Sequence, residues 1–278
     1  MNWLLEPLQY AFMLRGLLAA LLVGILCAIM GTYVVIRGMA FLGDAMAHAI
    51  LPGVAIAYLL QGNLLLGALF AAVLIALGIG IFSKGGMVKE DTAIGILFAA
   101  ALALGVAIIS SIQTYAVDLS HILFGNILGV STADLWLTAG LGICVLLVVA
   151  INFKQFMVIS FDPVLAATLR LPAEFLRNLM MLLLAITVVV SLQTVGVSLA
   201  VAMLVTPAAA AYLLTRRLFP MMVVSAVIGA SSSLIGLYLS YYLNIVSGSA
   251  IVLTATGIFL VVFLFNPRQG ILRRKIRS

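Results

Sequence analysis

The sequence predicts an all-α, polytopic membrane protein with about eight or nine transmembrane helices. Of its 278 residues, 65% are hydrophobic and 8% are charged, whereas a soluble domain carries roughly 25% charged residues. Its 14 basic and 8 acidic side chains could not cover the surface of a soluble fold of this length. The apolar residues also gather in runs of about 20, long enough to cross a bilayer core about 30 Å thick. Lipid is therefore the expected solvent for most side chains.

Each expected span corresponds to one apolar run. The runs cover about residues 12–36, 39–60, 63–83, 92–111, 133–153, 178–193, 195–214, 219–242 and 249–266. The second run contains Pro52, which removes an amide donor and disfavours helix in the preceding residue, so this span is expected to be broken. Residues 111–132 are expected to form a surface or re-entrant hairpin, and residues 178–214 could hold a re-entrant pair instead of two spans.

Lysine and arginine are concentrated in short segments between the runs, which is typical of cytoplasmic loops. Such segments are residues 152–178, Arg216 with Arg217, and a basic tail that begins at Arg268. Alternating sides from these anchors places the N-terminus outside. No repeat or low-complexity linker divides the chain, so residues 1–278 are expected to form a single integral-membrane domain. The net charge of +6 follows this loop pattern and does not indicate a nucleic-acid partner.

Asp44 and His48 interrupt the second apolar run and are the candidate metal ligands. Because they stand four residues apart on a helix, both side chains project from one face. A carboxylate among Leu, Ile and Ala costs several kcal/mol unless a cation, a partner or a water-filled path compensates it. Imidazole nitrogen with carboxylate oxygen suits Zn²⁺, Mn²⁺ and Fe²⁺. A proton relay would fit the same pair; alternatively, Asp44 caps the helix and His48 bonds a neighbour.

Two ligands make a weak site, which is compatible with transport because a transported ion must leave as readily as it enters. Two copies of the chain on a two-fold axis could supply a second Asp44 and His48 and complete four ligands. The metal is then a cargo, and no permanently bound cofactor is expected. His121 is a further candidate for a gate or vestibule ligand; the alternative is an anchor at the membrane–water interface.

Enzymatic activity is not expected. The sequence has no glycine-rich loop followed by Lys and Ser or Thr, so it lacks a P-loop for ATP. Its two histidines lie on segments without a nearby nucleophile pattern, and a His-Glu-x-x-His pattern is missing. An intramembrane protease is therefore disfavoured.

Four segments, in order along nearly the whole chain, carry a family resemblance. They are FLGDAMAHAILPG at 41–53, LFGNIL at 123–128, FDP at 161–163 and AMLVTPAAA at 202–210. These segments resemble the permease subunits of bacterial manganese, zinc and iron ABC importers. Three further segments resemble the manganese-type members more than the zinc-type ones, at 3–10, 118–126 and 266–272. The resemblance implies a type II ABC importer-like permease in the bacterial cell membrane with Mn²⁺ as cargo, and leaves Zn²⁺ or Fe²⁺ as alternatives.

The resemblance also implies partners. These are a second copy of the permease in a homodimer, separately encoded cytoplasmic ATP-binding subunits and an extracytoplasmic metal-binding protein. It implies metal coordination by Asp44 and His48, and a cytoplasmic coupling segment at about residues 154–177 that docks on the ATPase. The coupling residues are Phe161, Asp162, Pro163, Leu165 and Ala166. The family usually has glycine where this chain has Arg170. A proton-coupled secondary metal transporter is the alternative from another class, and collapse of the proton gradient would distinguish the two.

Overall fold

The computed structural model describes residues 6–84, 88–111 and 127–265, and all regular structure in these ranges is helical. Two short 3-10 helices are η1 (Pro7–Gln9) and η3 (Ile127–Gly129). The α-helices are α1 (Ala11–Ile36), α2 (Leu42–Ala49), α3 (Leu51–Leu59), α4 (Leu64–Phe82), α5 (Glu90–Ser110), α7 (Thr132–Ile151), α8 (Phe153–Phe161), α9 (Pro163–Thr168), α10 (Ala173–Val195), α11 (Val197–Leu214), α12 (Leu218–Leu243) and α13 (Ser247–Phe265).

Nine helical segments in the described ranges are long and apolar enough to cross a membrane, which confirms the predicted number. α2 and α3 together form one of them, and the helix is interrupted as the sequence predicted, although the break lies at Ile50, two residues before Pro52. Pro52 lies in the first turn of α3, where a backbone amide has no intrahelical partner, so the missing amide of proline costs no hydrogen bond. α10 and α11 are each long enough to span, and they join at Gly196, whose φ of +83° suits glycine.

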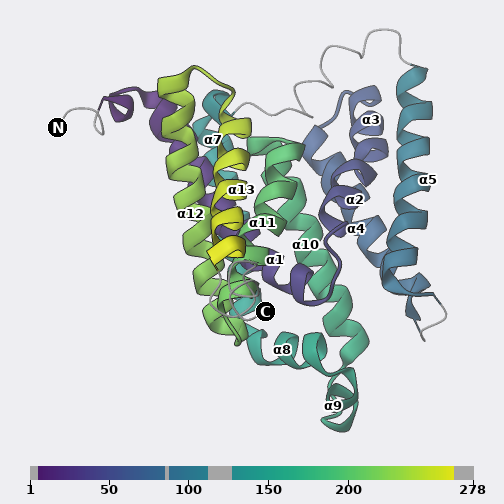
Figure 1. The fold of residues 1–278 in the computed structure, drawn as a ribbon. Helices are drawn as coiled ribbons and strands as arrows, with labels where there is room; N and C mark the ends of the chain where they lie inside the picture. The colour runs from purple at the N-terminus through teal and green to yellow at the C-terminus, as the bar shows by residue number, and fades with distance from the viewer. Residues whose placement is uncertain (1–5, 85–87, 112–126, 266–278) are drawn as a thin grey trace.

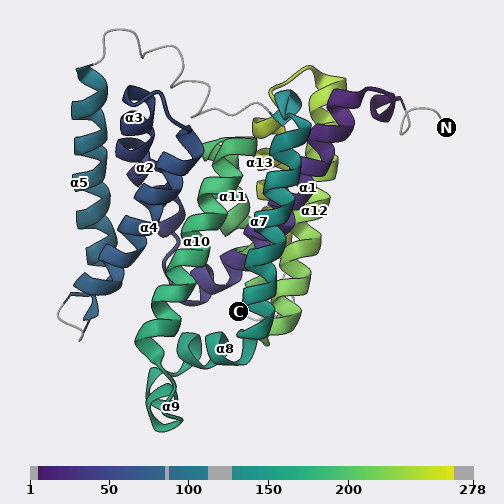
Figure 2. The same cartoon turned by 180° about the vertical axis from the view of Figure 1, so that it is seen from behind.

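The spans run alternately in opposite directions, and α8 and α9 lie together at one end of the bundle (Figures 1 and 2). α4 ends and α12 begins at this same end. Lys84 follows α4, and Arg216 and Arg217 connect α11 to α12, so basic connections gather here. The positive-inside rule predicts that this end is cytoplasmic. α1 begins at the opposite end, as expected for an external N-terminus.

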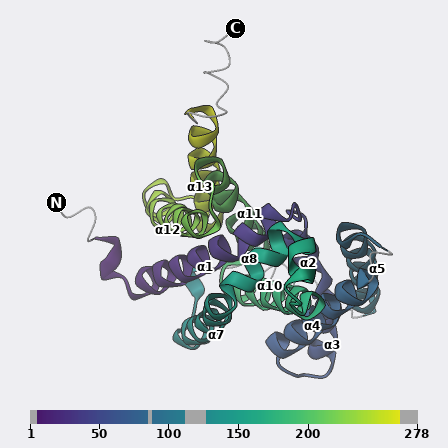
Figure 3. The same ribbon diagram turned by 90° about the horizontal axis from the view of Figure 1, so that it is seen from below.

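α1 is the central helix and packs against α7, α10, α11 and α12 (Figure 3). Its glycines permit close approach of backbones. A Cβ at Gly31 would overlap the carbonyl oxygen of Leu204 in α11, and a Cβ at Gly24 would crowd Ser233 in α12. Lipid tails are as apolar as the helix surfaces, so such close packing contributes much of the association between transmembrane helices.

α2, α3, α4 and α5 form a second group, on the right in Figure 1. Gly53 of α3 and Gly67 of α4 face each other, and a Cβ on either would overlap the other's backbone. α2 contacts α4 and α5 of its own group and also α10 and α11. The helix that carries Asp44 and His48 therefore lies where the two groups meet.

Candidate metal site

α2 presents its two ionisable side chains on a single open face. Six of its eight residues are buried, and the two that are not are Asp44 and His48. Nε2 of His48 lies 3.6 Å from Oδ1 of Asp44, and the two side chains are 29% and 43% exposed. An oxygen donor and a nitrogen donor thus stand side by side, one turn apart, with room for a further group beside them.

Phe98 of α5 forms an apolar wall beside His48. The two ring centroids are 6.2 Å apart, and the same phenyl ring packs edge-on against Phe41 at 5.5 Å. This packing restricts the imidazole and shields one side of the pair from water. Sequence reasoning missed Phe98, because it lies inside an apolar run where nothing distinguishes it from a lipid-facing side chain.

Asp44 lies in the first turn of α2 but does not cap the helix, because no side chain caps this turn. Within the described part of the chain, no three His, Cys, Asp or Glu side chains come together. One chain therefore brings two candidate ligands to this place, as the sequence indicated. His121 lies outside the described residues, and its role as a gate or vestibule ligand stays a prediction.

α8 and α9 contain the residues expected to couple to an ATPase. Asp162 separates the two helices and caps α9, because Oδ1 accepts hydrogen bonds from the amides of Val164 at 3.0 Å and Leu165 at 2.9 Å. Pro163 occupies the first position of α9, where no amide is needed. The side chains of Phe161 and Leu165 are exposed. The sequence FDP thus builds a stable start for a short helix at the cytoplasmic end.

Ala166 differs from the other coupling candidates because it is fully buried. It lines a cavity of about 220 Å³ together with Glu90, Arg177 and other residues. Its methyl group therefore faces the chain itself. The exposed side chain of Val164, which the sequence did not single out, extends the apolar tip formed by Phe161 and Leu165.

α9 ends in a Schellman motif centred on Arg170. The amide of Leu171 donates to the carbonyl of Ala166, and the amide of Arg170 donates to that of Ala167, both at 3.1 Å. Arg170 has a φ of +53°, a left-handed conformation that costs about 1–2 kcal/mol for residues other than glycine. This geometry explains why glycine suits the position, and the turn is kept with arginine in its place.

A network of ionic contacts joins the coupling region to the start of α2. Arg37, between α1 and α2, donates from Nη2 to both carboxylate oxygens of Glu90 at 2.8 Å. Nε of Arg177 in α10 lies 3.5 Å from Oε1 of the same carboxylate, and its Nη2 donates to the carbonyl of Gly80 at 3.1 Å. Burial lowers the pKa of the Arg37 guanidinium, and the Glu90 carboxylate opposes that shift. A guanidinium nevertheless stays charged at physiological pH.

Sequence reasoning did not identify this network. Arg37 follows the apolar run at about 12–36 and Glu90 precedes the run at about 92–111, and the predicted topology puts both at the cytoplasmic side. That shared side was the only available signal, since the residues are 53 positions apart.

Replacing Glu90 by Gln is expected to lower the free energy of unfolding by about 2 kcal/mol, because Arg37 and Arg177 lose their carboxylate while remaining 13% and 20% exposed. Thermal unfolding in detergent measures the change. The control is Lys84→Gln, which removes an ion pair to Glu174 whose side chains are 68% and 57% exposed. That change should stay within about 0.5 kcal/mol. Equal destabilisation by both variants would contradict the contribution to stability that we assign to the network of Arg37, Glu90 and Arg177.

Sequence comparison and structure comparison both point to transport proteins. Residues 9–266 match the ABC 3 transport family. The chain belongs to this family. The manganese transport system membrane protein MntC of Halalkalibacterium halodurans is 47% identical over 98% of this chain and 94% of the relative. A probable iron transport system membrane protein of Haemophilus influenzae is 40% identical over 100% of this chain and 98% of the relative.

Among solved structures, PsaBC from Streptococcus pneumoniae in complex with Fab superposes on this ABC 3 family chain with a TM-score of 0.85. The sequences are 41% identical, and the match covers 98% of each chain. Family membership and the nine apolar spans confirm the expected type of protein: a multi-pass permease of the bacterial membrane.

Proposed function

We propose that this chain is the permease subunit of an ATP-driven importer whose cargo is a divalent metal, with Mn²⁺ as the first candidate. The observation that carries the proposal is the open Asp44–His48 face on an otherwise buried helix of an ABC 3 family permease. The name of the manganese relative supports Mn²⁺ as the cargo. The name of the iron relative, at 40% identity, makes Fe²⁺ the second candidate.

The donor types at the pair support a divalent cargo. A carboxylate oxygen and an imidazole nitrogen together suit borderline divalent cations. Two copies whose α2 faces meet across a two-fold axis would offer two carboxylates and two imidazoles to one ion. A homodimer also covers the exposed ionisable face that a single chain would leave open within the membrane. The pair is then both the metal site and the part of the dimer interface that lines the path.

The apolar tip of α9 supports docking of a separate ATP-binding subunit. Phe161, Val164 and Leu165 are exposed at the cytoplasmic end, where water rather than lipid would otherwise meet them. On the opposite side, an extracytoplasmic metal-binding protein would deliver the ion. Both partners follow from the importer class that we propose.

A set of contacts connects the α9–α10 region to Arg37, in the connection that leads into α2. α9 leads directly into α10, where Arg177 contacts Glu90, and Glu90 holds Arg37 at the start of the α2 connection. Movement of α9 imposed by the ATPase would therefore be transmitted to α2. ATP must bind more tightly to one state of the assembly than to the other for this movement to occur.

Uptake by proteoliposomes that contain the permease with its ATPase, supplied with the metal-binding protein, tests the proposed function. We expect Mn²⁺ uptake to require ATP and to continue after an ionophore collapses the proton gradient. Full-rate uptake without the ATPase would overturn the proposal. Loss of uptake on collapse of the gradient would favour the proton-coupled alternative.

Asp162→Ala is expected to weaken association with the ATPase about fivefold, because loss of the N-cap costs a helix about 1 kcal/mol. Co-purification of the ATPase with the permease measures this. Asp162→Asn is the matched control: asparagine caps as well as aspartate does, so association should be retained. Equal impairment in both variants would show that the carboxylate charge, rather than the cap, is what matters.

A further inference from the structure

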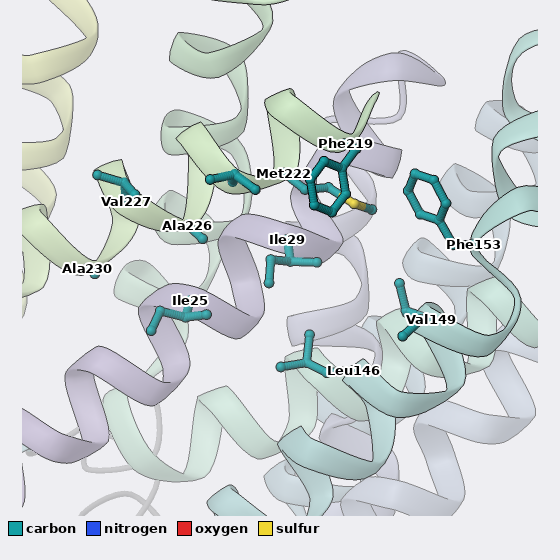
Figure 4. Close-up of a pocket in the computed structure, with 12 residues that line it drawn as sticks. Ile25, Ile29, Leu146, Val149, Phe153, Phe219, Met222, Ala226, Val227 and Ala230 are labelled. Atoms are coloured by element: carbon teal, nitrogen blue, oxygen red, sulfur yellow. The ribbon is translucent and has the colours of Figure 1, made fainter. Parts of the chain in front are cut away.

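α1, α7 and α12 enclose an apolar groove on the outer surface of the bundle (Figure 4). Its volume of about 660 Å³ falls within the range of roughly 300–1,000 Å³ that ligand pockets occupy. Every lining residue is apolar, including Ile29 of α1 and Val149 of α7. The α12 wall carries the exposed side chains of Phe219, Val223 and Val227. The groove therefore opens away from the bundle, toward lipid.

The groove has the length of one bilayer leaflet. On α12 it is lined from Phe219 to Ala230 by residues three and four positions apart, which share one helical face. At 1.5 Å per residue these positions span about 16 Å, half of a hydrocarbon core about 30 Å thick. Because Phe219 lies in the first turn of α12, at the cytoplasmic end, the groove occupies the cytoplasmic leaflet.

Three basic residues lie close in sequence to the residues that line the cytoplasmic end of the groove. The rings of Phe153 and Phe219 meet there edge-to-face, with centroids 6.2 Å apart. Lys154 follows Phe153, and Arg216 and Arg217 directly precede α12; all three side chains are exposed. In the described ranges, none of the three forms an ion pair. The sequence thus places positive charge near this end of the groove, and the described chain does not neutralise it.

We propose that this groove binds a phospholipid with an anionic headgroup. An acyl chain lies between α1, α7 and α12, and the phosphate meets Lys154, Arg216 and Arg217. A zwitterionic lipid would fill the groove but leave the cations without net counter-charge. A second copy of the chain fits less well, because a two-fold interface here would bring the same three cations together. Two of the helices that line the groove, α7 and α12, lie away from α3 and α5, toward the left in Figure 3.

Native mass spectrometry of the full-length permease purified with its ATPase tests this inference. The probes are palmitoyl-oleoyl phosphatidylglycerol and the matching phosphatidylcholine. The wild type should retain the anionic lipid preferentially. Arg217→Gln should weaken that preference about fivefold, the effect of one cation beside an anionic lipid surface. Lys89→Gln is the matched control, because Lys89 is exposed at the start of α5, and it should leave the preference unchanged.

A groove-filling variant provides an independent test. Ala226→Trp should remove the retained lipid of both kinds, because the indole occupies the acyl site. An unchanged phosphatidylglycerol preference in Arg217→Gln would overturn the proposal, and that exposed site does not endanger folding. Unchanged lipid retention in Ala226→Trp would overturn it as well. A changed oligomeric state with unchanged lipid would identify the groove as an interface between copies instead.

Discussion

Asp44→Asn is expected to lower the initial rate of Mn²⁺ uptake about 100-fold at limiting metal. Asparagine keeps the shape of the side chain but removes the charge. At 4 Å and an effective dielectric constant of about 20, two unit charges attract by about 4 kcal/mol, and a tenfold effect needs about 1.4 kcal/mol. In a dimer each substitution removes two charges from the shared site. Uptake of radioactive ⁵⁴Mn²⁺ into proteoliposomes supplied with ATP measures the rate.

Asp91→Asn is the control for Asp44→Asn. Asp91 is an exposed acid in the first turn of another span, α5, so the chemical change and the kind of position are matched. Uptake should stay near the wild-type rate. Both variants should also keep wild-type thermal stability, because Asp44 caps no helix and is 43% exposed. Unchanged uptake by the Asp44 variant would contradict the assignment of Asp44 as a ligand of the transported metal.

Gly31→Ala is expected to lower the free energy of unfolding by about 3 kcal/mol. An added Cβ would overlap the carbonyl oxygen of Leu204, a main-chain atom that can yield only if α1 and α11 move apart. Overpacking a well-fitted core costs about 1–3 kcal/mol or more, and here the crowded atom belongs to a backbone. Separation of these helices would also disturb α2, which packs on α11. Thermal unfolding in detergent and the uptake rate should both fall.

Gly95→Ala in α5 serves as the matched control for Gly31→Ala. A Cβ at Gly95 meets no atom within 4 Å, so the same substitution introduces no overlap. Alanine has the higher helix propensity, by up to about 1 kcal/mol, so this variant should be at least as stable as the wild type. If both alanine variants unfolded at the wild-type temperature, the close α1–α11 packing would be contradicted.

The spans could be predicted from the sequence because lipid exposure requires long apolar runs, and those runs are visible in one dimension. The clearest departure is the start of α10, at Ala173 rather than about residue 178. Glu174 and Arg177 looked like loop residues. In the fold they lie in the first turns of a helix, where Arg177 contacts Glu90 and the Gly80 carbonyl. Arg177 is accommodated in the helix by partners that are distant in the sequence, so a local pattern does not show them.

The candidate site could be predicted only as far as local geometry reaches. Asp44 and His48 are four residues apart on one helix, so their common face followed from the sequence. Phe98 beside His48 depends on how α5 packs against α2, and Arg37 with Glu90 depends on how the ends of three helices meet. These contacts join residues whose spacing carries no periodic signal. The only sequence signal for the left-handed turn at Arg170 was the glycine that the family usually has there, because arginine itself does not indicate a positive φ.

Pulsed electron paramagnetic resonance of Mn²⁺ bound to the purified permease tests most directly whether this pair holds the cargo. The chain has two histidines, so a hyperfine coupling to an imidazole nitrogen has few possible sources. We predict that this coupling is present in the wild type, persists in His121→Gln and disappears in His48→Gln. A nitrogen coupling that survives in His48→Gln, or bound Mn²⁺ without any imidazole coupling in the wild type, would contradict the account.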